Sequence, residues 1–139
     1  MKKDERLHHR SLVEGLYRKG RSFYEYPLRV TWRKLSPDEM RANFRNNPPE
    51  GIGAVQMMVT VPKKKRKRAV DRVLMRRRIR ESYRLNRESL LRIVEHKDSI
   101  RTFSIGFVYQ HPDNMSYHEL DEKMKAAIGK LCKLVDKDN

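Results

Sequence analysis

The sequence lacks most of the features that mark secreted and membrane proteins. Its one cysteine, Cys132, excludes an intrachain disulfide and fits a reducing compartment. No apolar run approaches the roughly 20 residues that a membrane helix needs. The N-terminus is basic, but no apolar region of a secretory signal follows it. We therefore expect a soluble, cytoplasmic protein with no membrane contact.

The sequence also has few of the patterns that catalysis or metal binding needs. It contains no glycine-rich phosphate loop, no His-Glu-x-x-His motif and no paired cysteines. His8 and His9 are adjacent, so their side chains would diverge on a helix and would not chelate one ion. His96, His111 and His118 also lack the spacing of metal ligands. We expect no catalytic residue and no metal site in the protein itself.

What the sequence has in excess is positive charge, and most of it lies in one segment. The 139 residues include 33 Lys or Arg and 18 Asp or Glu, for a net charge of +15. Residues 63–87 contain thirteen of these cations and only two acids, Asp71 and Glu81, so this segment alone carries +11. Charge concentrated in this way predicts a polyanionic partner, and nucleic acid is the first candidate. The length fits a single RNA-binding domain over residues 1–139.

The first part of the basic segment, residues 63–68, is a run of six consecutive cations. Such a run attracts phosphates by releasing their counterions and reads no sequence. Together with Pro62 it also resembles a nuclear import signal, and a solvated loop can have the same composition. This run alone therefore leaves the kind of partner open.

The second part predicts a long helix at about residues 70–93. Residues suited to burial recur there at helical spacing and form one stripe; they are Met75, Ile79, Ser82, Tyr83, Asn86 and Leu90. Arg76, Arg80, Arg84 and Arg87 run beside this stripe, with few acids to form the i,i+4 pairs of an ordinary exposed face. Arginine suits RNA because its planar fork bridges phosphate oxygens.

The other elements predict an α+β fold with helices covering one face of a sheet. Helices are expected at 11–19, after a Ser11–Glu14 capping box, and from a second capping box at Ser116–Glu119 to the C-terminus. Alternating apolar residues predict strands at 28–33, 54–61 and 103–109, with a short edge strand at 23–26. Residues 35–53 are rich in proline and glycine and predict a loop with one helical turn from Ser36.

The basic helix resembles the signature of the bacterial ribonuclease P protein subunit. Residues 67–83 read KRAVDRVLMRRRIRESY, and the positions that match the family are Ala69, Val70, Arg72, Arg76, Arg77, Arg80, Glu81 and Tyr83. Val73 and Leu74 stand where the family has Asn and a second Arg, and the basic lead-in lacks the family's glycine. The resemblance extends to Arg6-Leu7, to the first helix, and to residues 18–22.

The resemblance implies a two-layer α/β sandwich of order α-β-β-β-α-β-α with a left-handed β-α-β crossover. It implies an accessory protein subunit of an endoribonuclease whose active site lies in a catalytic RNA subunit. That complex removes the 5′ leader from precursor tRNA. The implied partners are the RNA subunit and precursor tRNA, with no obligate protein partner. The implied cofactor is Mg²⁺, used by the RNA–protein complex.

The resemblance also implies two RNA-binding surfaces. The catalytic RNA would bind Lys63, Lys64, Lys65, Arg66, Lys67, Arg68, Arg72, Arg76, Arg77 and Arg80. The single-stranded leader would lie in a cleft between the first helix and the sheet, where aromatic side chains stack on bases; the cleft residues would be Val13, Tyr17, Arg29 and Trp32. For Trp32, Phe103 and Phe107, strand alternation favours the core over the cleft.

Other functions compatible with the residues belong to different classes. The chain could be a structural RNA-binding protein, such as a ribosomal protein of similar fold, and the altered signature at Val73 and Leu74 keeps this alternative open. A DNA-binding protein would place the arginine helix in a major groove. An autonomous nuclease is the weakest alternative, because no metal site can be assembled from these residues.

Overall fold

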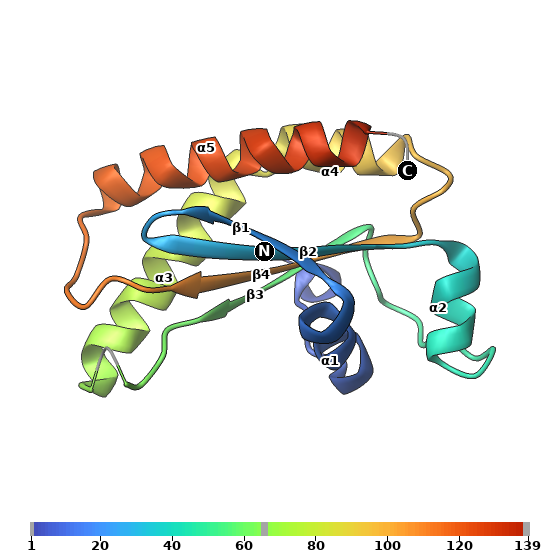
Figure 1. Cartoon of the computed structure of the whole chain (residues 1–139), viewed down its shortest axis with the longest axis horizontal. Helices are drawn as coiled ribbons and strands as arrows, with labels where there is room; N and C mark the ends of the chain where they lie inside the picture. Colours follow the sequence, from blue (N-terminus) through green and yellow to red (C-terminus); the bar gives the residue numbers. More distant parts are fainter. Residues whose placement is uncertain (1, 65–66, 138–139) are drawn as a thin grey trace.

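The computed structural model describes residues 2–64 and 67–137 and contains one sheet with helices on both faces (Figure 1). The strands are β1 (Arg21–Glu25), β2 (Leu28–Leu35), β3 (Val55–Thr60) and β4 (Thr102–Tyr109). The helices are the 3-10 turn η1 (Lys3–Glu5), α1 (Arg10–Lys19), α2 (Pro37–Asn43), α3 (Ala69–Asn86), α4 (Glu88–Glu95) and α5 (Tyr117–Asp136). The α+β prediction is confirmed, but helices cover both faces of the sheet and not only one as predicted.

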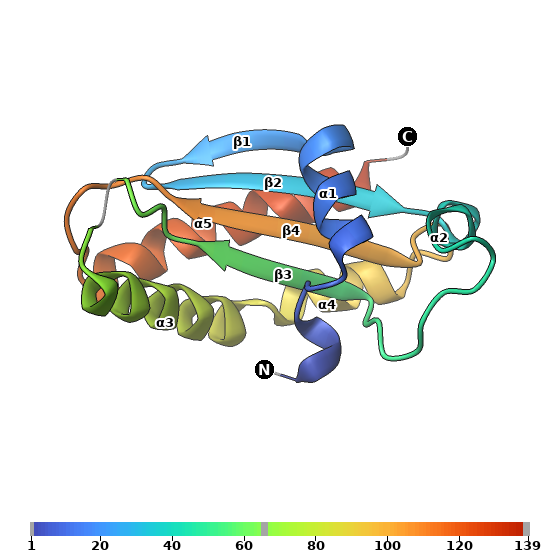
Figure 2. The same ribbon diagram turned by 90° about the horizontal axis from the view of Figure 1, so that it is seen from below.

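The sheet has the strand order β1-β2-β4-β3, with β3 and β4 parallel and the other neighbours antiparallel. Figure 2 views the sheet from the α1 side, where β3 and β4 both point left and β4 lies above β3. Their connection passes through α3 and α4 on the far face. The β3-to-β4 crossover is therefore left-handed, as the family resemblance implied, against the usual right-handed rule.

Strand alternation divides the interior into two hydrophobic clusters. The larger lies between the sheet and the helices α3, α4 and α5, and it contains Trp32, Phe103 and Phe107 with the apolar stripes of these helices. The smaller lies on the other face, where Leu12 and Leu16 of α1 pack with residues from β2 and α2. The two faces of the sheet are thereby covered unequally, because α1 crosses only part of its side (Figure 2).

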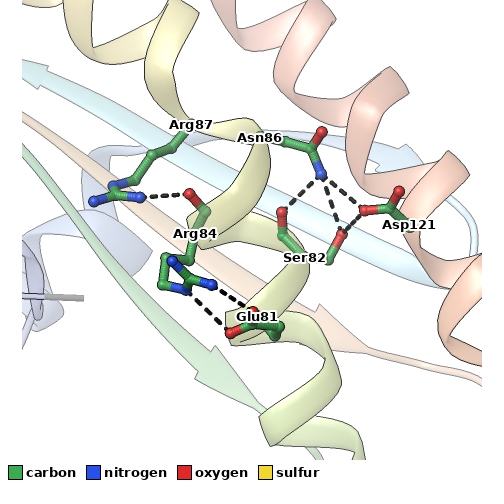
Figure 3. A network of polar contacts seen from close by, with 6 residues as sticks. All are labelled: Glu81, Ser82, Arg84, Asn86, Arg87 and Asp121. Atoms are coloured by element: carbon green, nitrogen blue, oxygen red, sulfur yellow. Dashed lines mark hydrogen bonds and ion pairs between the residues drawn. The ribbon is translucent and has the colours of Figure 1, made fainter.

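A polar network joins α3 to α5 (Figure 3). The Asp121 carboxylate accepts hydrogen bonds from Ser82 Oγ at 2.7 Å and from Asn86 Nδ2 at 2.8 Å. Ser82 is fully buried, so its hydroxyl needs a partner inside the protein. These bonds fix the rotation of α3 about its own axis, and that rotation decides where its arginines point.

The predicted helix over 70–93 is two helices in the structure. Asn86 Nδ2 donates to the Ser82 carbonyl oxygen at 2.7 Å, which competes with the backbone bond that continues a helix. α3 ends there, Arg87 is its C-cap, and α4 begins at Glu88 with a bond from Leu91 N to the Arg87 carbonyl. The single-helix prediction was wrong because Asn86 was read only as a stripe position.

Two other local predictions need correction. α1 begins at Arg10 after His9, whose side chain makes no capping bond, so Ser11 is not the N-cap. The Ser11 hydroxyl instead accepts a bond from Asn43 at the end of α2. The predicted loop over 35–53 contains α2, a two-turn helix whose N-cap Ser36 forms a capping box with Glu39.

In the part of the chain that the structure describes, no helix has the length and apolar character to cross a membrane.

Replacing Asp121 with alanine should destabilise the protein by about 1–3 kcal/mol, because Ser82 and Asn86 would lose their common acceptor. Urea unfolding at pH 7 measures this loss. Glu122→Ala, at an exposed neighbouring position, is the matched control and should change the free energy of unfolding far less. Equal losses in both variants would show that the network does not hold α3 against α5.

Candidate nucleic-acid interface

One side of α3 is buried and the adjacent side carries arginines. Met75, Ile79, Ser82 and Tyr83 are buried against the sheet and α5. Residues 72, 76 and 80 follow each other at i+4 spacing, which places them in one row along a helix. We call Arg72, Arg76 and Arg80 the arginine flank.

Arg6, in the N-terminal segment, adds a further guanidinium group beside the arginine flank. Arg6 bridges to Met57 on the free edge of β3. Burial lowers the pKa of Arg80, and the positive charges of Arg6 and Arg76 lower it further. Three like charges therefore lie close enough to disfavour one another. A bound phosphate would relieve this repulsion and would gain charge-assisted hydrogen bonds.

The N-terminal segment is held in place by backbone and side-chain bonds. Leu7 N donates to the Met57 carbonyl oxygen at 2.9 Å, and Leu7 itself is buried. Arg87 Nε donates to Glu5 Oε1 at 2.5 Å, and the Glu5 side chain is only 8% exposed. Both contacts flank Arg6 and direct it to α3. Arg6 was not assigned to the site from the sequence. The apolar residue directly after it, Leu7, was the available sign that this segment is fixed against the sheet.

The other predicted RNA-subunit residues lie at or before the start of α3, except Arg77 in its middle. Arg72 Nη1 donates to the Lys67 carbonyl oxygen at 2.8 Å, which holds the end of the basic run close to the helix. Arg77 is exposed. The remaining exposed members are Lys63, Lys64, Lys67 and Arg68. The predicted residues Lys65 and Arg66 lie outside the described residues.

The arginines of α3 are not equivalent. Arg78 points toward the loop before α5 and donates to the Met115 carbonyl oxygen at 2.5 Å. Arg84 pairs with Glu81 at 2.6 Å, as Figure 3 shows. Val73, which replaces the family's Asn, is 39% exposed and adds no charge. We therefore expect the outer surface of α3 to bind anions less strongly than the arginine flank.

A second surface lies on the sheet beside α1. Tyr17 of α1 reaches over the strands and is 47% exposed. A Cβ atom at Gly106 of β4 would lie 2.6 Å from the Tyr17 hydroxyl, so only glycine leaves room for this side chain. Burial raises the pKa of Tyr17, while a hydrogen bond with Thr60 and the charge of Arg29 act in the opposite direction. Residues of β2, β3 and β4 thus position the Tyr17 side chain.

β1 extends this surface with a second aromatic ring. Tyr24 is 59% exposed, and the guanidinium carbon of Arg29 lies 6.0 Å from its ring centroid, within range of a cation–π contact. We call Tyr17, Tyr24 and Arg29 the tyrosine face. Sequence reasoning left Tyr24 out of the site. Its alternation with Phe23, which packs against the larger core, was the signal that Tyr24 points the other way.

Two predicted cleft residues do not belong to the tyrosine face. Trp32 lies on the opposite side of the sheet, stacks on Phe103 with centroids 6.0 Å apart, and is only 7% exposed. Its assignment to the cleft was wrong, because odd and even positions of β2 face opposite ways. Val13 is partly buried against the smaller cluster. Phe103 and Phe107 are fully buried in the larger one, as alternation favoured.

Within residues 2–64 and 67–137, no group of three or more His, Cys, Asp or Glu side chains is arranged to hold a metal ion.

A family model described as Ribonuclease P matches residues 1–132. The chain belongs to the ribonuclease P protein family. The curated relatives include the ribonuclease P protein component of Porphyromonas gingivalis strain ATCC 33277, 30% identical over 132 residues, covering 95% of this chain and 86% of the relative. The same protein of strain W83 is 29% identical with the same coverage.

Solved structures agree with the fold. The ribonuclease P protein from Thermotoga maritima matches with a TM-score of 0.62 at 18% identity, over 91% of this chain and 96% of that one. The protein from Staphylococcus aureus matches with a TM-score of 0.59 at 19% identity, over 100% and 97%. Because the sequences have diverged this far, the match concerns the fold and not individual contacts. None of these matches favours the ribosomal alternative.

The tyrosine face can be tested with a short single-stranded RNA. Tyr17→Ala should weaken its binding roughly 5- to 150-fold, since stacking is worth about 1–3 kcal/mol per base. Gly106→Ala should reproduce part of this loss by displacing the intact Tyr17 ring. Fluorescence anisotropy with labelled RNA measures both. Tyr26→Ala removes an equally exposed tyrosine from the turn after β1 and should leave affinity unchanged; an equal loss there would contradict the assignment.

The Glu5–Arg87 pair predicts a specific acid sensitivity. Burial raises the pKa of Glu5, but the Lys2 backbone N–H and Arg87 outweigh it, so the pKa lies below its ordinary value of 4.5. As pH falls, Glu5 is therefore protonated in the unfolded chain before it is protonated in the folded protein. The stabilisation by the Glu5–Arg87 pair is complete above about pH 4.5 and is lost as pH falls through the folded-state pKa.

Glu5→Gln should consequently lose less stability than the unmodified protein between pH 7 and pH 3. Urea unfolding at both pH values provides the comparison. Glu14→Gln, which alters an exposed ion pair with Arg10, serves as the control. An identical pH dependence in all three proteins would show that the Glu5 carboxylate does not hold the N-terminal segment.

Proposed function

We propose that this chain is the protein subunit of a ribonuclease P ribonucleoprotein, in which it binds a catalytic RNA and the 5′ leader of precursor tRNA. The observation that carries the proposal is the convergence of Arg6, Arg76 and Arg80 beside the β3 edge. Guanidinium groups that approach one another repel, and RNA phosphates bound there would relieve this repulsion. The family match over residues 1–132 supports the RNA subunit of ribonuclease P as that RNA.

In this proposal the two surfaces have separate tasks. The arginine flank and the basic run before it bind the catalytic RNA, mainly through phosphates. The tyrosine face binds the single-stranded leader, because exposed rings stack on bases of any sequence and Arg29 attracts the backbone. The two surfaces lie on different parts of the sheet. The arginine flank lies at β3 and α3, and the tyrosine face lies at β1, β2, β4 and α1.

The proposal assigns no chemical step to a protein side chain. The described residues offer no carboxylate cluster that fits Mg²⁺, so we derive no step through a metal held by the protein. Chemistry assisted by Mg²⁺ then belongs to the RNA partner, and the protein contributes binding and charge neutralisation. A cytoplasmic location follows from a partner and a substrate of this kind.

Reconstitution tests the proposal directly. The protein is combined with the catalytic RNA from its own source and with precursor tRNA, and leader removal is followed over a Mg²⁺ titration. We expect the protein to lower the Mg²⁺ concentration needed for cleavage, because its cations replace part of the metal's electrostatic role. Unchanged cleavage at every Mg²⁺ concentration would refute the proposed function.

The arginine flank should dominate binding to the catalytic RNA. Arg76→Ala combined with Arg80→Ala should weaken it and flatten the dependence of log K on log salt by up to about one unit per lost phosphate contact. Arg41→Ala with Arg92→Ala removes the same charge from residues already paired with Asp38 and Glu88. If this control pair has the same effect on the salt slope, net charge and not the arginine flank drives binding.

A further inference from the structure

A cavity of about 610 Å³ lies where the sheet is incomplete. β1 begins at Arg21, which pairs with Trp32, so residues 33–35 of β2 pair with β4 but have no partner from β1. The ends of α1 and α5, the start of α2 and the segment before β4 surround this notch. We call it the notch cavity; it belongs neither to the arginine flank nor to the tyrosine face.

The lining of the notch cavity is strongly basic. Glu39 is its one carboxylate, against six cationic side chains: Lys19, Arg21, Arg33, Lys34, Lys97 and Lys137. Two of the lysines have a structural task, because Lys34 Nζ donates to the Lys137 carbonyl oxygen at 3.1 Å and Lys97 Nζ to that of Asp136 at 3.5 Å. They satisfy the C-terminal carbonyls of α5.

Among the described residues, three other cations of the cavity do not bond to carbonyls of α5. In the described part of the chain, Lys19, Arg21 and Arg33 have no ion-pair partner. The Arg33 side chain passes beneath α1, and a Cβ atom at Gly15 would lie 2.2 Å from its Nη1 atom. Glycine at this position therefore lets Arg33 extend between the helix and the sheet into the cavity wall.

Apart from Ser36 and Ser99, the remaining lining is apolar. Trp32, Ile100 and Val135 contribute to the wall and are themselves almost fully buried. Cations beside a small apolar surface suit a nucleotide, whose phosphates need charge and whose base needs an apolar contact. The volume lies in the range of pockets that bind small ligands, about 300–1,000 Å³, and excludes a duplex.

We propose that the notch cavity binds one nucleotide of a single-stranded RNA, with its flanking phosphates on Lys19, Arg21 and Arg33. This rests on the proposed function for the choice of RNA as the polymer, whereas the phosphate chemistry rests on the cavity alone. The site is a third RNA contact of the chain, at the opposite end of β2 from Arg29.

Trp32 is the only tryptophan in the chain, so its fluorescence reports on this cavity. The protein alone is titrated with a single-stranded RNA pentamer, with inorganic pyrophosphate and with duplex RNA. We expect saturable changes in Trp32 emission with the pentamer and with pyrophosphate. Lys19→Ala with Arg21→Ala should weaken both roughly tenfold or more, through lost charge-assisted bonds. Arg10→Ala with Lys123→Ala, the matched control, removes the same charge from exposed residues outside the cavity and should leave them unchanged.

Three results would overturn the proposal: no saturable change with the pentamer, a response to pyrophosphate alone, or a response to duplex RNA equal to that of the pentamer. Equal weakening by both variant pairs would also overturn it. Failure of the reconstituted complex to cleave precursor tRNA would not affect the Trp32 titration, so failure of the function and failure of this site are distinguishable. Thermal unfolding of each variant verifies that it is folded.

Discussion

The burial of one side of α3 is the constraint on which both the fold and the RNA-binding surface depend. Met75, Ile79 and Tyr83 are fully buried, and Tyr83 meets Phe107 edge-on with centroids 5.8 Å apart. Because a helix is rigid, fixing this side fixes the row of residues about 100° away, where the arginine flank lies. Ser82, Asn86 and Asp121 then remove the remaining rotational freedom. A flexible tail with the same composition would present no such ordered row.

The N-terminal segment completes the surface and shows how a charged site is built on a small core. Glu5 and Leu7 anchor Arg6 on either side, one by an ion pair and one by burial. The positive charges of Arg6 and Arg76 lower the pKa of Arg80, which indicates repulsion among the three guanidinium groups. This repulsion is local, since Arg84 and Arg78 elsewhere on α3 are bonded within the chain. Anion binding is therefore favoured at one place along the helix.

Periodicity predicted the buried and exposed sides of each element well, because it follows from backbone geometry alone. The apolar stripe of α3, the face of α5 and the alternation of β2 and β4 all appear as predicted. What failed depended on contacts between distant residues. The break at Arg87, the position of Arg6 and the environment of Tyr24 are set by neighbours that the local sequence does not contain. Trp32 was assigned to the cleft for a different reason. The family resemblance suggested that position, although the alternation of β2 favoured the core.

We propose that two separate surfaces bind two different RNAs, and site-directed cleavage can distinguish them. In a Cys132→Ser background, a hydroxyl-radical reagent is attached to Arg77→Cys on α3 or to Ser22→Cys on the face of β1 beside Tyr24. Each protein is assembled with the catalytic RNA and precursor tRNA. We predict that the reagent on α3 cleaves the catalytic RNA, whereas the reagent on β1 cleaves the leader. Cleavage of the same RNA segment from both positions would show that the two surfaces do not bind different RNAs.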